Sequence, residues 1–143
     1  MYRHFGDRAG LLAELYREFD ERQHAVLDAA LLNAPAQLDA VAEIVAGSYL
    51  DCSAAEGAEM AGVVDALSGS PVLDELRRDS VRAYAGKCGA ALAPFAPAGS
   101  VPEADLHAVV GAGDALARAV ASDLTTATAA RATLTRVILS LTH

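Results

Sequence analysis

Apolar residues recur every three or four positions through most of this chain, which is the spacing of an amphipathic α-helix. The clearest run follows Asp7, and its apolar members are Leu12, Leu15, Tyr16, Phe19, Val26, Leu27, Ala30 and Leu31. Asp7 can accept hydrogen bonds from the free N–H groups of the first turn, whereas Asn33 and Pro35 should end the helix. The pattern therefore predicts a helix over residues 8–32.

The same spacing predicts five further helices. Their expected ranges are about 35–52, 55–67, 71–93, 102–122 and 128–141. The start of the fourth is the most distinct, because Ser70 suits an N-cap and Pro71 suits the first helical position. No alternating apolar pattern indicates a strand. We therefore expect an all-α protein, a helical bundle of about six helices.

The composition agrees with one helical domain and limits its partners. Alanine, the best helix former, supplies much of the apolar content. The formal net charge is -8, so these residues should be repelled by nucleic acid, which binds Lys and Arg. The two cysteines show no disulfide pattern, and neither a signal peptide nor a membrane-spanning run is evident. We expect a cytoplasmic protein without a membrane partner.

No residue pattern indicates catalysis or a bound metal ion. A di-iron bundle needs two Glu-x-x-His pairs, and only Glu21 and His24 have this spacing. The other histidines, His4, His107 and His143, lie in separate predicted elements. Neither a Cys-x-x-Cys pair, a glycine-rich phosphate loop nor a nucleophile elbow occurs. We therefore expect no enzymatic activity, no metal site and no cofactor.

The first residues combine aromatic, basic and histidine side chains at a helix boundary. The segment reads YRHFGDRAGLLAELY, from Tyr2 to Tyr16. Donors clustered at the end of one helix and the start of the next suit contacts to phosphate oxygens. From the residues alone, the simpler explanation is a basic N-terminal end that balances an acidic domain.

This segment resembles the junction between the recognition helix and the fourth helix of TetR-family transcriptional regulators. Order and spacing both agree: an aromatic residue, His-Phe, a small residue, an acid, a base, and a helix containing Leu-Leu. By this resemblance, Tyr2, His4 and Arg8 would touch the DNA backbone, and Phe5 would pack inside. The rest of the chain is similar to the family only in its helix layout.

The resemblance implies two unequal parts. Residues 1–7 would be the remnant of the recognition helix and its turn, and residues 8–143 would be the effector-binding and dimerisation domain. Family members carry a three-helix DNA-binding unit with a helix-turn-helix before this segment. The chain as it stands should not read a DNA sequence, because the base-reading part of a recognition helix is missing.

The function implied by the resemblance is transcriptional regulation, as a ligand-responsive repressor. A ligand that binds one conformation better would shift the spacing of two DNA-binding heads. Two alternatives stay open: a stand-alone helical module that pairs with a full-length relative, and a small-molecule-binding bundle without DNA binding. The effector is expected to be small and apolar or amphipathic, and the sequence names neither it nor the operator.

An effector pocket is expected among the first four helices. Such pockets are largely apolar with a few polar groups. The inward-facing candidates are Tyr16, Phe19, Tyr49, Cys52, Met60, Tyr84 and Cys88. Plain core packing is the alternative for each of them, and the tyrosines are the most informative because a buried hydroxyl needs a partner.

The last two helices are the expected dimerisation pair. Glycines in the fifth helix would let another helix approach closely, and the sixth helix ends on an apolar run. The predicted interface residues are Gly111, Gly113, Leu116, Val120, Leu134, Val137, Ile138 and Leu141. Packing of these residues within one chain is the alternative to the homodimer that we expect.

Overall fold

A computed structural model describes residues 7–142 of the chain. Within this range there are six α-helices, one 3₁₀ helix and no strand, so the predicted all-α bundle is confirmed. The elements are α2 (Arg8–Leu32), α3 (Leu38–Glu59), α4 (Ala61–Leu67), α5 (Pro71–Leu92), η1 (Ala93–Phe95), α6 (Glu103–Ala121) and α7 (Ala127–Ser140). Tyr2 and His4, which the resemblance placed at the DNA backbone, and Phe5, which it placed in the interior, lie outside the described residues.

The helix starts with clear capping residues fall where the sequence predicts. The Asp7 side chain accepts a hydrogen bond from the Ala9 N–H at 3.0 Å. The Ser70 hydroxyl oxygen accepts one from the Val72 N–H at 3.2 Å, and Pro71 is the first residue of α5. Each cap provides an acceptor for an N–H group that has no partner within its helix.

The second and third helices differ from the prediction. The predicted end at residue 52 is wrong, because α3 continues to Glu59, and α4 starts only at Ala61. No proline or glycine stands between residues 52 and 55, and the Ser53 hydroxyl donates to the Tyr49 carbonyl within the helix at 3.2 Å. The break lies at Met60, whose backbone has φ -114 and ψ 6.

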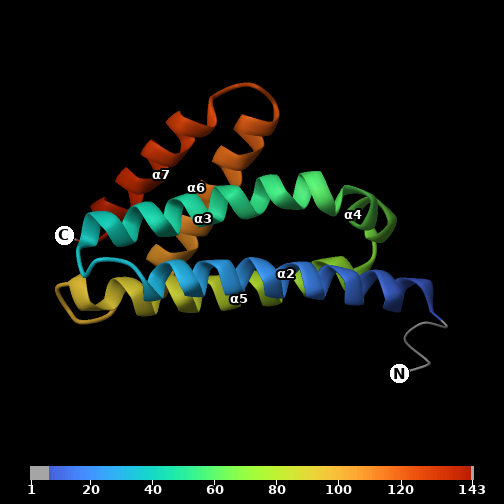
Figure 1. The fold of residues 1–143 in the computed structure, drawn as a ribbon, viewed down its shortest axis with the longest axis horizontal. Helices are drawn as coiled ribbons and strands as arrows, with labels where there is room; N and C mark the ends of the chain where they lie inside the picture. Colours follow the sequence, from blue (N-terminus) through green and yellow to red (C-terminus); the bar gives the residue numbers. More distant parts are fainter. Residues whose placement is uncertain (1–6, 143) are drawn as a thin grey trace.

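The helices pack around α3, which touches every other α-helix. The helices α2 and α5 lie side by side along one flank of α3 (Figure 1). On the other flank, α6 and α7 form a hairpin, and the contact between α3 and α7 is the most extensive in the molecule. The short helix α4 lies beyond the end of α3, against α2 and α5.

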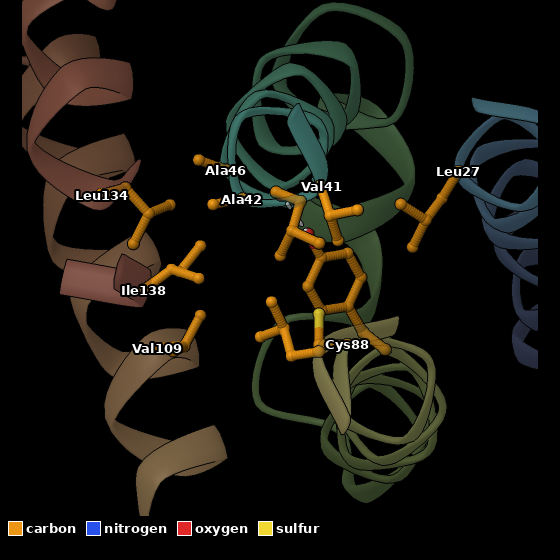
Figure 2. Packing of buried hydrophobic residues seen from close by; sticks show 11 residues of the cluster. Leu27, Val41, Ala42, Ala46, Cys88, Val109, Leu134 and Ile138 are labelled. Atoms are coloured by element: carbon orange, nitrogen blue, oxygen red, sulfur yellow. Dashed lines mark hydrogen bonds between the residues drawn. The ribbon is translucent and has the colours of Figure 1, made fainter. Parts of the chain in front are cut away.

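A large apolar cluster joins α3 to the hairpin and to α5. Figure 2 shows Leu134 and Ile138 of α7 pointing toward Ala42 and Ala46 of α3, whose small side chains allow the two helices to approach closely. Each fully buried branched side chain stabilises the fold by about 1.5–3 kcal/mol. The members of this large cluster are Leu27, Val41, Ala42, Val45, Ala46, Tyr84, Cys88, Leu92, Val109, Leu134 and Ile138.

A small apolar cluster stands apart at the other end of the bundle. It joins the first half of α2 to α4 and to the first half of α5, and its members are Ala13, Tyr16, Leu67, Leu73 and Leu76. Between the two clusters, α2 and α5 carry the polar side chains of Asp20, His24 and Ser80, which are mostly shielded from solvent. The core is therefore divided by a polar layer.

Part of the predicted dimer interface lies inside the single chain. Leu134 and Ile138 are 0% exposed within the large cluster. Gly113 is buried against the ring of Tyr49. These three residues cannot form a surface for a second copy, because the chain itself already covers them. Gly111 is exposed, and the remaining candidates, Leu116, Val120, Val137 and Leu141, are half-buried.

Candidate ligand cavity

A cavity of about 820 Å³ opens along the second half of α3. Its walls come from α2, α3, α5, α6 and α7. They include Tyr16 of the small cluster and Leu27 and Tyr84 of the large one, so the cavity borders the polar layer between them. Pockets of roughly 300–1,000 Å³ are typical of sites that enclose a small molecule.

Four of the seven predicted pocket residues line this cavity: Tyr16, Tyr49, Cys52 and Tyr84. The other three do not line it. Phe19 and Cys88 are 1% exposed and are not among the wall residues. Met60 lies at the break between α3 and α4 and is not among the wall residues. Helical spacing identified residues that face the interior, but it did not distinguish those that line the cavity from those that pack in the core.

Tyr16 belongs to a polar network that joins three helices. Its hydroxyl donates to Glu56 Oε2 of α3 at 3.0 Å, and Arg77 Nη2 of α5 donates to Glu56 Oε1 at 2.7 Å. Burial and the neighbouring Glu56 carboxylate raise the pKa of Tyr16 well above its usual value. The hydroxyl is therefore protonated, and it acts as a donor at one end of the cavity.

A second set of hydrogen-bonded polar side chains lies next to this network, further along α2. The Ser80 hydroxyl donates to Asp20 Oδ1 at 2.6 Å. His24 Nε2 lies 3.4 Å from Ser80 Oγ and 3.5 Å from Asp20 Oδ2. His24 Nδ1 is buried and has no hydrogen-bond partner among residues 7–142. Because Ser80 donates to the carboxylate and not to the imidazole, this trio lacks the geometry that activates a serine nucleophile.

Tyr49 and Tyr84 form an aromatic wall. Their ring centroids are 4.9 Å apart with an interplanar angle of 77°, the edge-to-face arrangement that aromatic pairs favour. The Tyr84 hydroxyl donates to the Val45 carbonyl at 2.5 Å, and the Tyr49 hydroxyl donates to the Asp114 carboxylate. Burial raises the pKa of both phenols. Each ring is thus held by contact with the other ring and by the hydrogen bond of its own hydroxyl.

The two cysteines are not suited to nucleophilic or metal chemistry. Burial raises the pKa of the Cys52 thiol to about 12, and burial also raises the pKa of the Cys88 thiol to about 12. A thiol must lose its proton to act as a nucleophile or a metal ligand. Within the described part of the chain, no three His, Cys, Asp or Glu side chains are grouped as a metal site. None of the helices described is long and apolar enough to cross a membrane.

Most polar wall residues were missed by the sequence reasoning. Arg77 was expected on a polar face, and no apolar stripe included the others. The missed wall residues include Gln23, His24, Arg77, Ser80, Asp114, Arg118 and Arg131. One signal was available: the inward apolar stripe of α2 is interrupted between Phe19 and Leu27, where Asp20 and His24 belong to the polar layer. Such an interruption marks an inward face that is not purely apolar.

The chain matches no protein-family model, no curated protein and no solved structure. Of the three candidate DNA-backbone residues, the structure describes Arg8, which is exposed at the first position of α2.

Proposed function

We propose that this chain is the small-molecule-sensing and dimerisation domain of a TetR-like transcriptional regulator, acting as a ligand-responsive repressor. The observation that carries the proposal is the cavity of about 820 Å³, whose walls include tyrosines from α2, α3 and α5. The motif at residues 2–16 supports the link to DNA, because α2 begins within it. Ligand binding would then act on the helix nearest to a DNA-binding head.

The network around Glu56 offers a route from the cavity to α2. Tyr16 lies about two helical turns after Arg8 and is tied through Glu56 to Arg77. A ligand that breaks or tightens these hydrogen bonds favours one position of α2 relative to α3 and α5. Ligand binding shifts the population toward the arrangement that it binds better.

The outer face of α6 supports a homodimer. Its exposed residues Ala104, Ala108, Gly111 and Ala115 recur at helical spacing and are all small. Small residues let a second helix approach closely, as in a four-helix interface with two-fold symmetry. Light scattering at micromolar concentration should give twice the mass of one chain. A monodisperse monomer would remove dimerisation from the proposal.

The cavity as a binding site is tested with the neutral apolar probe N-phenyl-1-naphthylamine, which fluoresces when it leaves water. Gly57 lines the cavity, and a Cβ added there meets nothing within 4 Å. Gly57→Leu should fold normally, fill part of the cavity and weaken probe binding by about tenfold. Gly86→Leu is the matched control, since Gly86 is an exposed helical glycine away from the walls. Equal binding by both variants would place the probe elsewhere.

A small-molecule-binding bundle without DNA binding is the second candidate, favoured by the net charge of -8. The reading frame upstream of Met1 distinguishes the two. If the frame continues into a helix-turn-helix, gel-shift assays with that longer protein should show operator binding that a cavity ligand changes. A stop codon directly upstream, or operator affinity that no cavity ligand alters, would favour the bundle alone.

A further inference from the structure

Arg131 reaches from α7 to α3 and lies over Gly47. If position 47 carried a Cβ, it would stand 2.6 Å from Arg131 Cζ and 2.7–2.9 Å from the two Nη atoms. The guanidinium therefore fills the space that the glycine leaves. Glycine weakens a helix interior relative to alanine, and in the middle of α3 it makes room for a charged group at the cavity wall.

Arg118 lines the same cavity from the last turn of α6. The turn at residues 122–126 joins α6 to α7, so the two arginines stand on adjacent arms of one hairpin. Neither guanidinium forms an ion pair with a carboxylate of residues 7–142. Arg77, the third arginine of the walls, differs because it is paired with Glu56.

Two of the three acidic wall residues accept hydrogen bonds from other side chains. Glu56 accepts from Tyr16 and Arg77, and Asp114 accepts from Tyr49. Asp51 is exposed and forms no ion pair within the described residues. The hairpin wall therefore holds two guanidinium groups whose donors are not taken up by an ion pair with a carboxylate of residues 7–142.

We propose that the cavity binds an amphipathic carboxylate, whose anionic group pairs with Arg131 and Arg118 and whose apolar body lies against Tyr49 and Tyr84. This assignment of ligand class rests on the proposed function of the cavity as a binding site. The planar fork of a guanidinium matches a carboxylate with two parallel hydrogen bonds. Because Gly47 has no Cβ, one of these forks can lie close to α3 at the cavity wall.

The test compares three probes that share one ring system and differ in charge: 2-naphthoate, 2-naphthol and 2-naphthylmethylammonium. Isothermal titration of the full chain should give the tightest binding for 2-naphthoate. Its Kd should rise with salt concentration, because ions screen the attraction. The neutral 2-naphthol should bind more weakly and without salt dependence.

Three variants test the assigned arginines. Arg131→Gln and Arg118→Gln remove the charge, whereas Gly47→Ala keeps it but pushes the guanidinium away from α3. Each should raise the Kd of 2-naphthoate about threefold to tenfold and leave that of 2-naphthol unchanged. Arg136→Gln is the matched control, because Arg136 is exposed on the same helix and does not line the cavity. Circular dichroism checks that each variant is folded.

Each of the other possible outcomes overturns one part of the proposal. Equal binding of the three probes, or a preference for the ammonium, overturns the carboxylate assignment and leaves the cavity as a binding site. A preference for 2-naphthoate that survives in the Arg118→Gln, Arg131→Gln double variant overturns the role of the two arginines. Binding of none of the three probes overturns both the ligand class and the proposed site.

Discussion

Two glycines set the positions of larger side chains at the cavity. Gly47 accommodates the Arg131 guanidinium, and Gly113 accommodates the ring of Tyr49, which Asp114 holds by its hydroxyl. Helical spacing predicts on which face of a helix a glycine lies, but not what fills the space beside it. That depends on a partner helix distant in sequence, so the sequence alone could not separate Gly113 from Gly111.

Replacing Gly113 with alanine should destabilise the protein. The new Cβ would stand 2.6 Å from Tyr49 Cδ1, and the ring has little freedom to move because Asp114 and Tyr84 hold it. We expect a loss of about 1–3 kcal/mol in the free energy of unfolding, measured by urea denaturation. Gly86→Ala, at an exposed helical site with nothing within 4 Å, should instead stabilise by up to about 1 kcal/mol. A Gly113→Ala protein as stable as the Gly86→Ala protein would contradict this packing.

The buried thiols predict a loss of stability at alkaline pH. Their pKa values are about 12 in the fold, compared with 9.0 for an ordinary thiol. Above pH 9 the unfolded chain therefore binds fewer protons than the folded one, so the free energy of unfolding falls as pH rises from 9 toward 12. The buried tyrosines act in the same direction above pH 10. Urea denaturation at a series of pH values measures this slope, which should be smaller in a Cys52→Ala, Cys88→Ala variant. A flat profile between pH 9 and pH 12 would contradict it.

At the scale of the elements, the sequence predicts best where a local signal exists. The caps at Asp7 and Ser70 gave the starts of α2 and α5 because capping involves only neighbouring residues. The break at Met60 has no such signal, since neither a proline nor a capping side chain marks it. For α7, the apolar positions were identified, but whether each faces the chain's own core or a second copy depends on tertiary packing.

Side chains on the two faces of α7 should contribute differently to the free energy of unfolding. Leu134 is fully buried against α3, so Leu134→Ala should lower the free energy of unfolding by about 2–5 kcal/mol. The loss should not depend on protein concentration, because the contact lies within one chain. Val137→Ala, at a half-buried position on the same helix, should cost about 1 kcal/mol or less. Thermal unfolding at two protein concentrations makes the measurement, and a concentration-dependent loss for Leu134→Ala would indicate an interface instead.

At the scale of the whole molecule, the core consists of two apolar clusters with a polar layer and a cavity between them. The all-α class followed from periodicity and alanine content, which are local properties. The cavity did not, because its walls come from five helices whose lining residues lie far apart in the sequence. The sequence therefore identified the tyrosines of the site but not its arginines or His24.

This division predicts that the two ends of the bundle open independently. The small cluster has five members and the large cluster eleven, so the end that contains α4 has less apolar contact to lose. Native-state hydrogen exchange should show lower protection in α4 and the first turns of α5 than in the middle of α3. Uniform protection across both ends would indicate a single cooperative unit. Tyr16→Phe, which removes a tie between α2 and α3, should increase the contrast.

The tyrosines of the cavity walls also make the intrinsic fluorescence of the protein sensitive to what the cavity holds. The chain contains no tryptophan and four tyrosines, and three of these, Tyr16, Tyr49 and Tyr84, line the cavity. Two of the three donate their hydroxyl hydrogen to a carboxylate, an arrangement that quenches phenol emission. A non-absorbing occupant that disturbs the hydrogen bonds of Tyr16 and Tyr49 should therefore relieve this quenching and raise the tyrosine fluorescence of the protein without any added label.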